Sequence, residues 1–402
     1  MSQLFRPTRP VPFAEFVALM AALTALAALS IDAMLPAIPQ IAADLSPDDP
    51  NRAQLVVTSF MVGIGFGMLV MGPLSDAIGR RPVIALGVAL YVVGALLAVI
   101  ADSMTMLLAA RVLQGLGISA PRTVSVAMIR DRYAGREMAR VLSFVMTVFI
   151  LVPAAAPFLG QTILGFAGWR MIFASFIIFG TLVMMWILLR QPETLAPEAR
   201  RPFRAGTIAA GMREVVSNRR VMLYVLTLVF GFAQMIALLS ASQPVYDVYF
   251  GRGDSFAMWF AIQALAAGTA GMLNAALVVR LGMRRMVMAA YAFQIAASAL
   301  ATGLWASGTF GGPEAFPVFF LWAVGVFYIA GLTFGNLNAL AIEPLGHIAG
   351  VASAVIGAIS TVLAVVMAVP VSLAFDGTPL PLMIGVLIFS TLALLTMVAN
   401  RR

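Results

Sequence analysis

Three charged residues lie inside long apolar stretches of the sequence: Asp32, Arg111 and Arg122. A charged side chain near the middle of a bilayer costs from a few to more than ~10 kcal/mol, so such residues pair with one another or face a water-filled cavity. Asp32 is the only carboxylate well inside the first of these stretches. A carboxyl group that alternates between wet and dry surroundings can bind and release a proton, so we predict that Asp32 carries a proton.

The two arginines are eleven residues apart in the sequence, which places them on one helix face at a separation of about 16 Å. Gln114 lies on the same face. Arg111 either takes part in proton coupling or holds helices together through buried carbonyl or ion-pair contacts. For Arg122, which follows Pro121, three roles stay open: it binds substrate, pairs with Asp32 or reaches the cytoplasmic mouth. A permanent pairing of Asp32 with either arginine would leave proton transfer to another group.

The composition is that of an integral membrane protein. Hydrophobic residues make up 62% of the 402 residues, charged residues make up 10%, and the mean hydropathy is +1.00. A helix that spans a bilayer needs about 20 mostly apolar residues, and runs of this length recur along the whole chain. The sequence therefore predicts an all-α membrane protein with twelve transmembrane helices, at residues 13–39, 52–74, 82–101, 104–128, 138–164, 169–190, 219–243, 255–279, 285–306, 315–340, 348–374 and 380–399.

Arginine supplies all the basic side chains other than one histidine, and its placement predicts the orientation. With both termini in the cytoplasm, the inner connections hold most of the arginines, and the outer ones hold only Arg52, Arg170 and Arg252. This distribution obeys the positive-inside rule. The net charge of +8 is explained by that rule and by anionic lipid of the inner leaflet, so no nucleic-acid partner is expected.

Residue types that enzymes and metal sites need are scarce. The chain has no cysteine and a single histidine, His347, which excludes disulfides and iron–sulfur clusters and leaves too few ligands for a histidine metal site. No HExxH pair, phosphate-binding loop or nucleophile elbow stands in a usable place. We therefore expect neither an enzyme nor a cofactor.

A long polar connection divides the chain near its middle. Residues 191–216 contain prolines, acids and arginines, and they separate residues 1–190 from residues 217–402, each with six predicted helices. The sequence Gly-Arg-Arg-Pro-Val at 79–83 is echoed by Gly-Met-Arg-Arg-Met-Val at 282–287. Internal repeats of this kind are typical of transporters in which two pseudo-symmetric bundles move around a central cavity.

The first inner connection combines glycine, acid and arginine between two apolar runs. Its residues Gly72, Asp76, Gly79, Arg80 and Arg81 suit a tight turn, a bridge to a helix end and an anchor at the cytoplasmic surface. The pattern resembles the loop between the second and third helices of the major facilitator superfamily, Gly-x-x-x-Asp-x-x-Gly-Arg-Arg/Lys. The resemblance implies the twelve-helix fold of that superfamily and a conformational gate at these residues.

A later segment points to one branch of the superfamily. The sequence at 344–354 resembles the Pro-x-x-His-Ile-Ala-Gly-x-Ala-Ser-Ala segment of the Bcr/CflA drug:proton antiporters, and with segments 32–39 and 111–117 the resemblance spans the whole chain. Glu343 and His347 stand at this helix junction. They form either a packed turn or a gate that responds to pH, because histidine titrates near neutrality.

The fifth predicted helix resembles the antiporter motif of drug exporters, Gly-Pro-x-x-Gly-Gly. Pro157 and Gly160 match it, whereas Ala156 and Gln161 replace glycines. Small residues still permit close helix contact, and proline bends the helix. The resemblance assigns Pro157 and Gly160 to the conformational gate, and the two departures leave uptake open as an alternative to export.

The resemblance as a whole implies proton-coupled efflux of small, mostly hydrophobic organic molecules by alternating access. It also implies a bacterial cytoplasmic (inner) membrane location, with the substrate, protons and membrane lipid as partners and a monomer as the working unit. The alternatives are a dedicated exporter of one endogenous metabolite or siderophore-like anion, and a proton-coupled uptake symporter. Candidates for proton coupling are Asp32, Arg111 and Arg122. Candidates for substrate binding are Asp32, Gln114, Arg122, Phe149, Gln161, Tyr246, Asn336 and Asn338.

Overall fold

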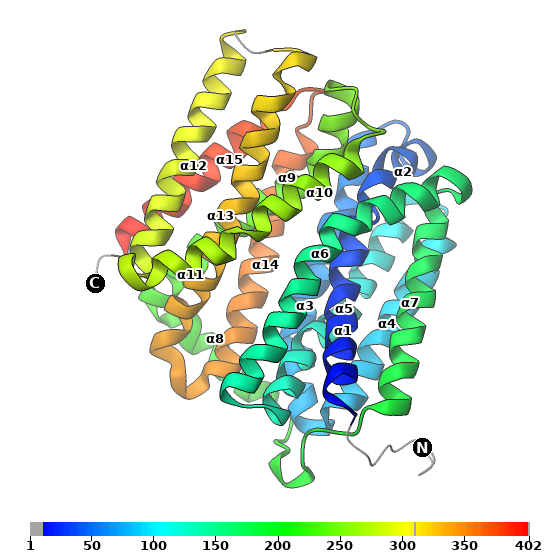
Figure 1. Ribbon diagram of the computed structural model, residues 1–402, viewed down its shortest axis with the longest axis vertical. Helices are drawn as coiled ribbons and strands as arrows, with labels where there is room; N and C mark the ends of the chain where they lie inside the picture. Colours follow the sequence, from blue (N-terminus) through cyan, green and yellow to red (C-terminus); the bar gives the residue numbers. More distant parts are fainter. Residues whose placement is uncertain (1–10, 309–310, 401–402) are drawn as a thin grey trace. The chain divides into compact units, whose positions relative to one another are not determined.

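The computed structural model describes residues 11–308 and 311–400, and all regular structure in them is helical (Figure 1). Eleven helical segments are long and apolar enough to cross a membrane. One of them, Pro313–Leu373, has 61 residues and contains two helices, α13 (Phe316–Ile342) and α14 (Ala349–Leu373), joined by the short helix η7 (Glu343–Ile348). Counting that segment as two gives twelve spans among the described residues, which confirms the predicted fold class.

The helices pack into two compact units. The first unit contains the chain up to Ala37 and the stretch Ser59–Gly206. Its elements are α1 (Phe13–Asp32), η2 (Leu35–Ala37), most of α3 (Leu55–Ile78), α4 (Arg80–Val99), α5 (Met104–Arg132), α6 (Gly135–Ala167), α7 (Trp169–Arg190) and η4 (Pro197–Ala199).

The second unit contains Ile38–Thr58 and the chain from Thr207 onward. The boundary after Gly206 falls inside the predicted connection 191–216. Besides α13, η7 and α14, the elements of this unit are α2 (Ile38–Leu45), η3 (Pro50–Gln54), α8 (Ala205–Ser217), α9 (Arg219–Pro244), η5 (Val245–Tyr249), α10 (Phe256–Gly268), α11 (Ala270–Leu281), α12 (Met283–Ala306), η6 (Pro313–Ala315) and α15 (Leu380–Ala399).

Two of the predicted spans are interrupted, while the other limits agree with the helices to within a few residues. The span predicted at 13–39 ends as an α-helix at Asp32 and continues through a turn into η2. Pro36 has no N–H to donate to the carbonyl four residues earlier, which accounts for this break. The span predicted at 255–279 divides at Thr269 into α10 and α11.

Glycines bring α5 close to its neighbours in the first unit. A Cβ on Gly115 would collide with the carbonyl oxygen of Phe60 in α3, and one on Gly117 would lie 2.5 Å from that of Gly87 in α4. Small residues let membrane helices pack through their backbones in this way. The contacts fix α5, and with it Arg111, against α3 and α4.

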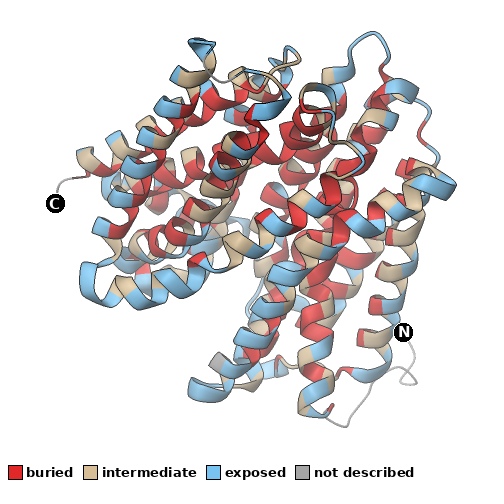
Figure 2. Ribbon diagram, turned by 45° about the horizontal axis from the view of Figure 1, so that its top comes forward, coloured by how far each residue is buried: buried red, intermediate tan, exposed pale blue. Residues whose placement is uncertain are grey.

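Figure 2 shows exposed positions along the helices, and many of the exposed residues are apolar. Phe166 and Val279 are 75% and 87% exposed. Lipid tails are as apolar as these side chains, so such a surface needs no protein partner inside a bilayer.

Candidate functional site

Asp32 is the last residue of α1 and is only 5% exposed. Among the described residues, none forms a hydrogen bond or ion pair with its carboxylate. The static pairing with Arg111 or Arg122 that the sequence left open is therefore not present in this conformation. Burying an ionised carboxylate without a partner is very unfavourable, so the position suits a group that is protonated when dry.

Arg111 is fully buried and contacts the end of α1 directly. Its Nη2 donates to the carbonyl oxygen of Ser30 at 3.2 Å, and its Nη1 donates to Oε1 of Gln114 at 2.6 Å. The guanidinium also lies over the rings of Phe60 and Phe173, 4.1 and 5.7 Å from their centroids. A cation is favourable at the carboxyl end of a helix, where carbonyl groups lack helical partners. Arg111 thus joins α1, α3, α5 and α7 and holds the turn that carries Asp32.

Gln114 and Arg122 differ in their surroundings although both lie on α5. Gln114 is fully buried and engaged by Arg111, whereas Arg122 is exposed. No carboxylate in the described part of the chain pairs with the Arg122 guanidinium. Its charge is therefore available to a ligand or to water.

The proline-containing part of α6 lies against the break in α1. A Cβ on Gly160 would collide with the carbonyl oxygen of Ala33, the residue after Asp32. Pro157 lies inside α6 one turn earlier. The segment that resembles the antiporter motif thus contacts the turn beside Asp32. Of the two other α6 candidates, Gln161 is half-buried and Phe149 is 37% exposed.

Three predicted substrate-binding residues lie in the second unit. Tyr246 is 1% exposed, packs edge-on against Phe256 and Phe316, and donates its hydroxyl to Gln263 at 3.2 Å. This packing makes Tyr246 a core residue of the second unit.

The two asparagines are both on α13. Asn336 is 5% exposed and donates to Oδ1 of Asn274 at 2.7 Å. Asn338 donates to the carbonyl oxygen of Phe334, one turn earlier, at 2.9 Å. The sequence did not predict a role for Asn274, because a single amide in an apolar helix has no recurring partner at helical spacing that would mark it.

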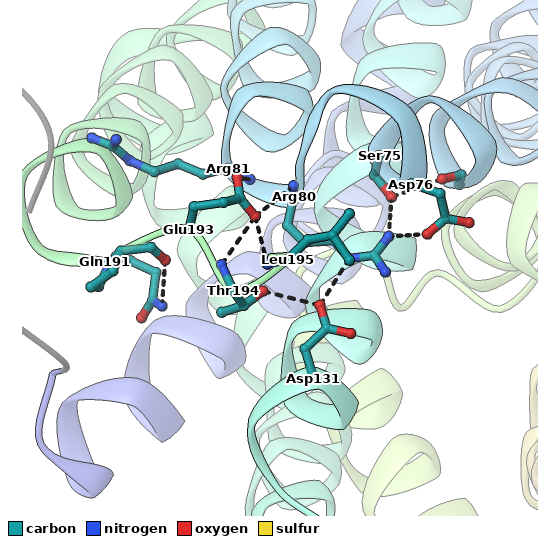
Figure 3. Close-up of polar contacts among 11 residues, drawn as sticks. Ser75, Asp76, Arg80, Arg81, Asp131, Gln191, Glu193, Thr194 and Leu195 are labelled. Atoms are coloured by element: carbon teal, nitrogen blue, oxygen red, sulfur yellow. Dashed lines mark hydrogen bonds and ion pairs between the residues drawn. The ribbon is translucent and has the colours of Figure 1, made fainter. Parts of the chain in front are cut away.

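A charged cluster occupies the connection between α3 and α4 (Figure 3). Arg80 donates through Nε to Asp131 of α5 at 3.0 Å and through Nη1 to Ser75 at 2.7 Å and to Asp76. Gly79 has φ of 109°, a value that favours glycine, whereas Gly72 lies within the regular part of α3. The arginine and acid of the predicted gate are therefore ion-paired within the first unit.

Glu193, which the sequence did not reveal, completes this cluster. Its carboxylate accepts the backbone N–H groups of Arg80 at 2.9 Å, Arg81 at 3.1 Å, and Thr194 and Leu195 at 3.0 Å each. The carboxylate thereby caps α4, a position that also favours negative charge. Arg81 in turn donates to the carbonyl oxygen of Leu188 in the last turn of α7. Both the end of α7 and the segment after it are therefore tied to the start of α4.

Glu343 and His347 lie in η7, and both are exposed. His347 contacts Glu214 of α8, with 2.8 Å between Nε2 and Oε1, rather than Glu343. A Cβ on Gly211 of α8 would collide with Val351 of α14. The junction is therefore a packing site for α8.

The comparisons with known proteins agree with this architecture. The model of the Major Facilitator Superfamily matches residues 20–369. The chain belongs to the Major Facilitator Superfamily. Members of this superfamily are transporters, so the chain is a multi-pass membrane transporter of small molecules and not an enzyme.

Relatives in the superfamily include transporters named for drug resistance. The chain is 33% identical over 341 residues to "Uncharacterized MFS-type transporter YdgK" of Bacillus subtilis (strain 168), covering 83% of each chain. It is 30% identical over 361 residues to "Bicyclomycin resistance protein homolog" of Haemophilus influenzae, covering 88% of this chain and 87% of the relative. The solved structure of a D-xylose-proton symporter matches with a TM-score of 0.75 at 14% identity over 98% of each chain, a likeness of fold alone.

Proposed function

We propose that this transporter exports small, mostly hydrophobic organic molecules in exchange for protons, with Asp32 as the proton carrier. The observation that carries the proposal is the burial of the Asp32 carboxylate at the break in α1, without a partner among the described residues. The relative named as a bicyclomycin resistance protein homolog supports export and a Bcr/CflA-like branch.

Coupling follows from the cost of an unpaired buried charge. When Asp32 is protonated, it is neutral and is tolerated in the dry site. When it loses the proton, the carboxylate requires water or a cationic or hydrogen-bonding substrate. Proton and substrate then favour different states of the site, which is the condition for each to drive the other.

The neighbouring residues take separate roles in this scheme. Arg111 is a positioning residue, because its contact with Ser30 fixes the turn before Asp32. Arg122 is an accessible cation within the apolar part of α5 and attracts or repels charged substrates. Gly160 of α6 touches the turn on its other side, so a movement of α6 changes the surroundings of Asp32.

The cluster of Asp76, Arg80, Asp131 and Glu193 is proposed as the conformational gate at the inner surface. It joins the ends of α3, α4, α5 and the segment after α7. We propose that this cluster, together with Arg81, stabilises the outward-open state of alternating access. We propose that the protein is a monomer in the cytoplasmic membrane of a bacterium. The inner arginines support the placement of both termini inside.

A second candidate is the dedicated export of one organic anion. The exposed guanidinium of Arg122, which has no carboxylate partner in the described residues, favours this alternative. Proton-coupled uptake is the third candidate, because Ala156 and Gln161 stand where the exporter motif has glycines.

Transport into everted membrane vesicles tests the function. A lipophilic cation, a neutral phenicol and an organic anion are offered in the presence of a proton gradient, with and without a protonophore. Accumulation of several unlike probes that the protonophore abolishes is the expected result. Accumulation of the anion alone would favour the dedicated exporter, and extrusion from the vesicles would favour uptake.

A further inference from the structure

Uncharged polar side chains surround the kink between α10 and α11. Thr269 stands at this kink, halfway along the membrane-spanning segment Phe256–Leu281. Its hydroxyl donates to the carbonyl oxygen of Ala266 at 2.7 Å, and its N–H donates to the same oxygen at 3.2 Å. Threonine hydroxyls that bond back to their own helix bend it, which explains the kink without proline.

The kink packs closely against α13. A Cβ on Gly331 of α13 would lie 2.7 Å from the Cβ of Ala270. One polar pair lies on each side of this contact along the two helices. Thr269 meets the hydroxyl of Tyr328 at 3.5 Å, and Asn336 donates to Asn274 at 2.7 Å.

Three of these four polar side chains are accessible at a depth where lipid would penalise them, and Asn336 lies buried behind them. Thr269 is exposed, and Asn274 and Tyr328 are partly exposed. Polar groups that face hydrocarbon without partners are unfavourable, so polar surface at mid-membrane depth lines a water-filled path. Transporter substrate sites typically lie at this depth, beside interrupted helices.

Three of these side chains, those of Thr269, Asn274 and Tyr328, also keep unused hydrogen-bonding capacity. The NH₂ group of Asn336 is already engaged, because it donates to Asn274 and to the carbonyl oxygen of Leu332 at 2.8 Å. The contact between Thr269 and Tyr328 is at the long limit for a hydrogen bond. The Asn274 amide accepts one hydrogen bond, and its NH₂ group donates none within the described residues. Each amide offers two donors and an acceptor, and each hydroxyl offers both. A ligand can therefore bind here without breaking a strong internal bond.

We propose that Thr269, Asn274, Tyr328 and Asn336 form a subsite for uncharged hydrogen-bonding groups of the substrate, namely hydroxyls and amides. The inference rests on the proposed function and extends it to a substrate class. The subsite has no ionised side chain, so it recognises uncharged groups and does not respond to the charge of a ligand. A site built on hydrogen bonds discriminates strongly against ligands that lack the matching groups.

Binding of two probes to the purified full-length protein tests the subsite. Chloramphenicol carries hydroxyls and an amide, and tetraphenylphosphonium carries a charge but no hydrogen-bonding group. The variant T269V/Y328F removes two hydroxyls and keeps the shapes of the side chains. The control is Thr391→Val on α15, whose hydroxyl likewise bonds a carbonyl of its own helix, that of Leu387, at 2.8 Å.

We expect T269V/Y328F to bind chloramphenicol about fivefold to twentyfold more weakly, with tetraphenylphosphonium affinity and melting temperature unchanged. Thr391→Val should match the wild type with both probes. An unchanged chloramphenicol affinity, or equal losses for both probes, would overturn the subsite. A wild type that binds only the cation would also overturn it while leaving the proposed function intact. Failure of any substrate to drive proton exchange would instead refute the proposed function.

Discussion

The guanidinium of Arg111 donates to the carbonyl oxygen of Ser30 at 3.2 Å, two residues before the proposed proton carrier. A helix that ends inside a membrane leaves carbonyl groups without partners. Arg111 supplies a donor to the last turn of α1, so the helix can stop at Asp32 within the apolar core. The charge of Arg111 and the position of Asp32 are thereby linked without an ion pair between the two.

Replacing Arg111 with lysine tests this link. Lysine keeps the charge but cannot donate in a planar fork to Ser30 and Gln114 or stack on Phe60. We expect Arg111→Lys to lower the free energy of unfolding by about 2–4 kcal/mol and to slow transport. Arg130→Lys, on the exposed end of the same helix, is the control. Thermal unfolding in detergent measures stability, and an unchanged melting temperature would contradict the assignment.

Gly160 offers a sharper test of the α6 contact. In Gly160→Ala the added methyl group collides with the carbonyl oxygen of Ala33, and overpacking of this kind costs about 1–3 kcal/mol. We expect a lower melting temperature and slower proton-coupled transport. Gly165→Ala on the same helix is the matched control, because no atom lies within 4 Å of its new Cβ. Equal behaviour of the two variants would show that the α1 turn does not depend on α6.

Glu193 should support transport without touching substrate. Glu193→Ala removes the acceptor of four backbone N–H groups, and the loss of a helix cap costs about 1–2 kcal/mol. We expect slower transport with substrate affinity unchanged, and Asp76→Asn should have the same pattern. Glu198→Ala, at an exposed position of the same segment, serves as control. A loss of affinity as large as that of Asp32→Asn would contradict a gating role.

The His347–Glu214 pair should contribute little. Its side chains are 64% and 42% exposed, and ion pairs in water are worth about 0–1 kcal/mol. We expect His347→Gln to change neither the melting temperature nor the dependence of transport rate on the pH of the cytoplasmic side. Stopped-flow transport between pH 6 and 8 checks this, and a displaced pH profile would establish the alternative of a pH-responsive gate.

The sequence predicted local features well and long-range contacts poorly. Apolar runs set the helix limits, and Asp32 stood out because a carboxylate is rare inside such a run. Glu193 was missed because it caps α4 from 113 residues further along the chain. Over such a separation the spacing in the sequence does not predict which residues lie close together.

The kink at Thr269 escaped prediction for a different reason. A threonine hydroxyl that bonds its own helix looks the same in sequence as one that does not, and no proline marks the position. The pairing of Asn274 with Asn336 likewise depends on which helices are neighbours. Tertiary packing, rather than local composition, decides both features.

The central claim is that Asp32 exchanges protons for substrate. The direct measurement uses proteoliposomes that enclose a pH-sensitive dye and carry an imposed proton gradient. They contain the wild type, Asp32→Asn or the control Asp48→Asn, which changes an exposed carboxylate. The account predicts that substrate triggers proton movement in the wild type and in Asp48→Asn, and none in Asp32→Asn. Proton movement that persists in Asp32→Asn, at a rate near that of the wild type, would contradict it.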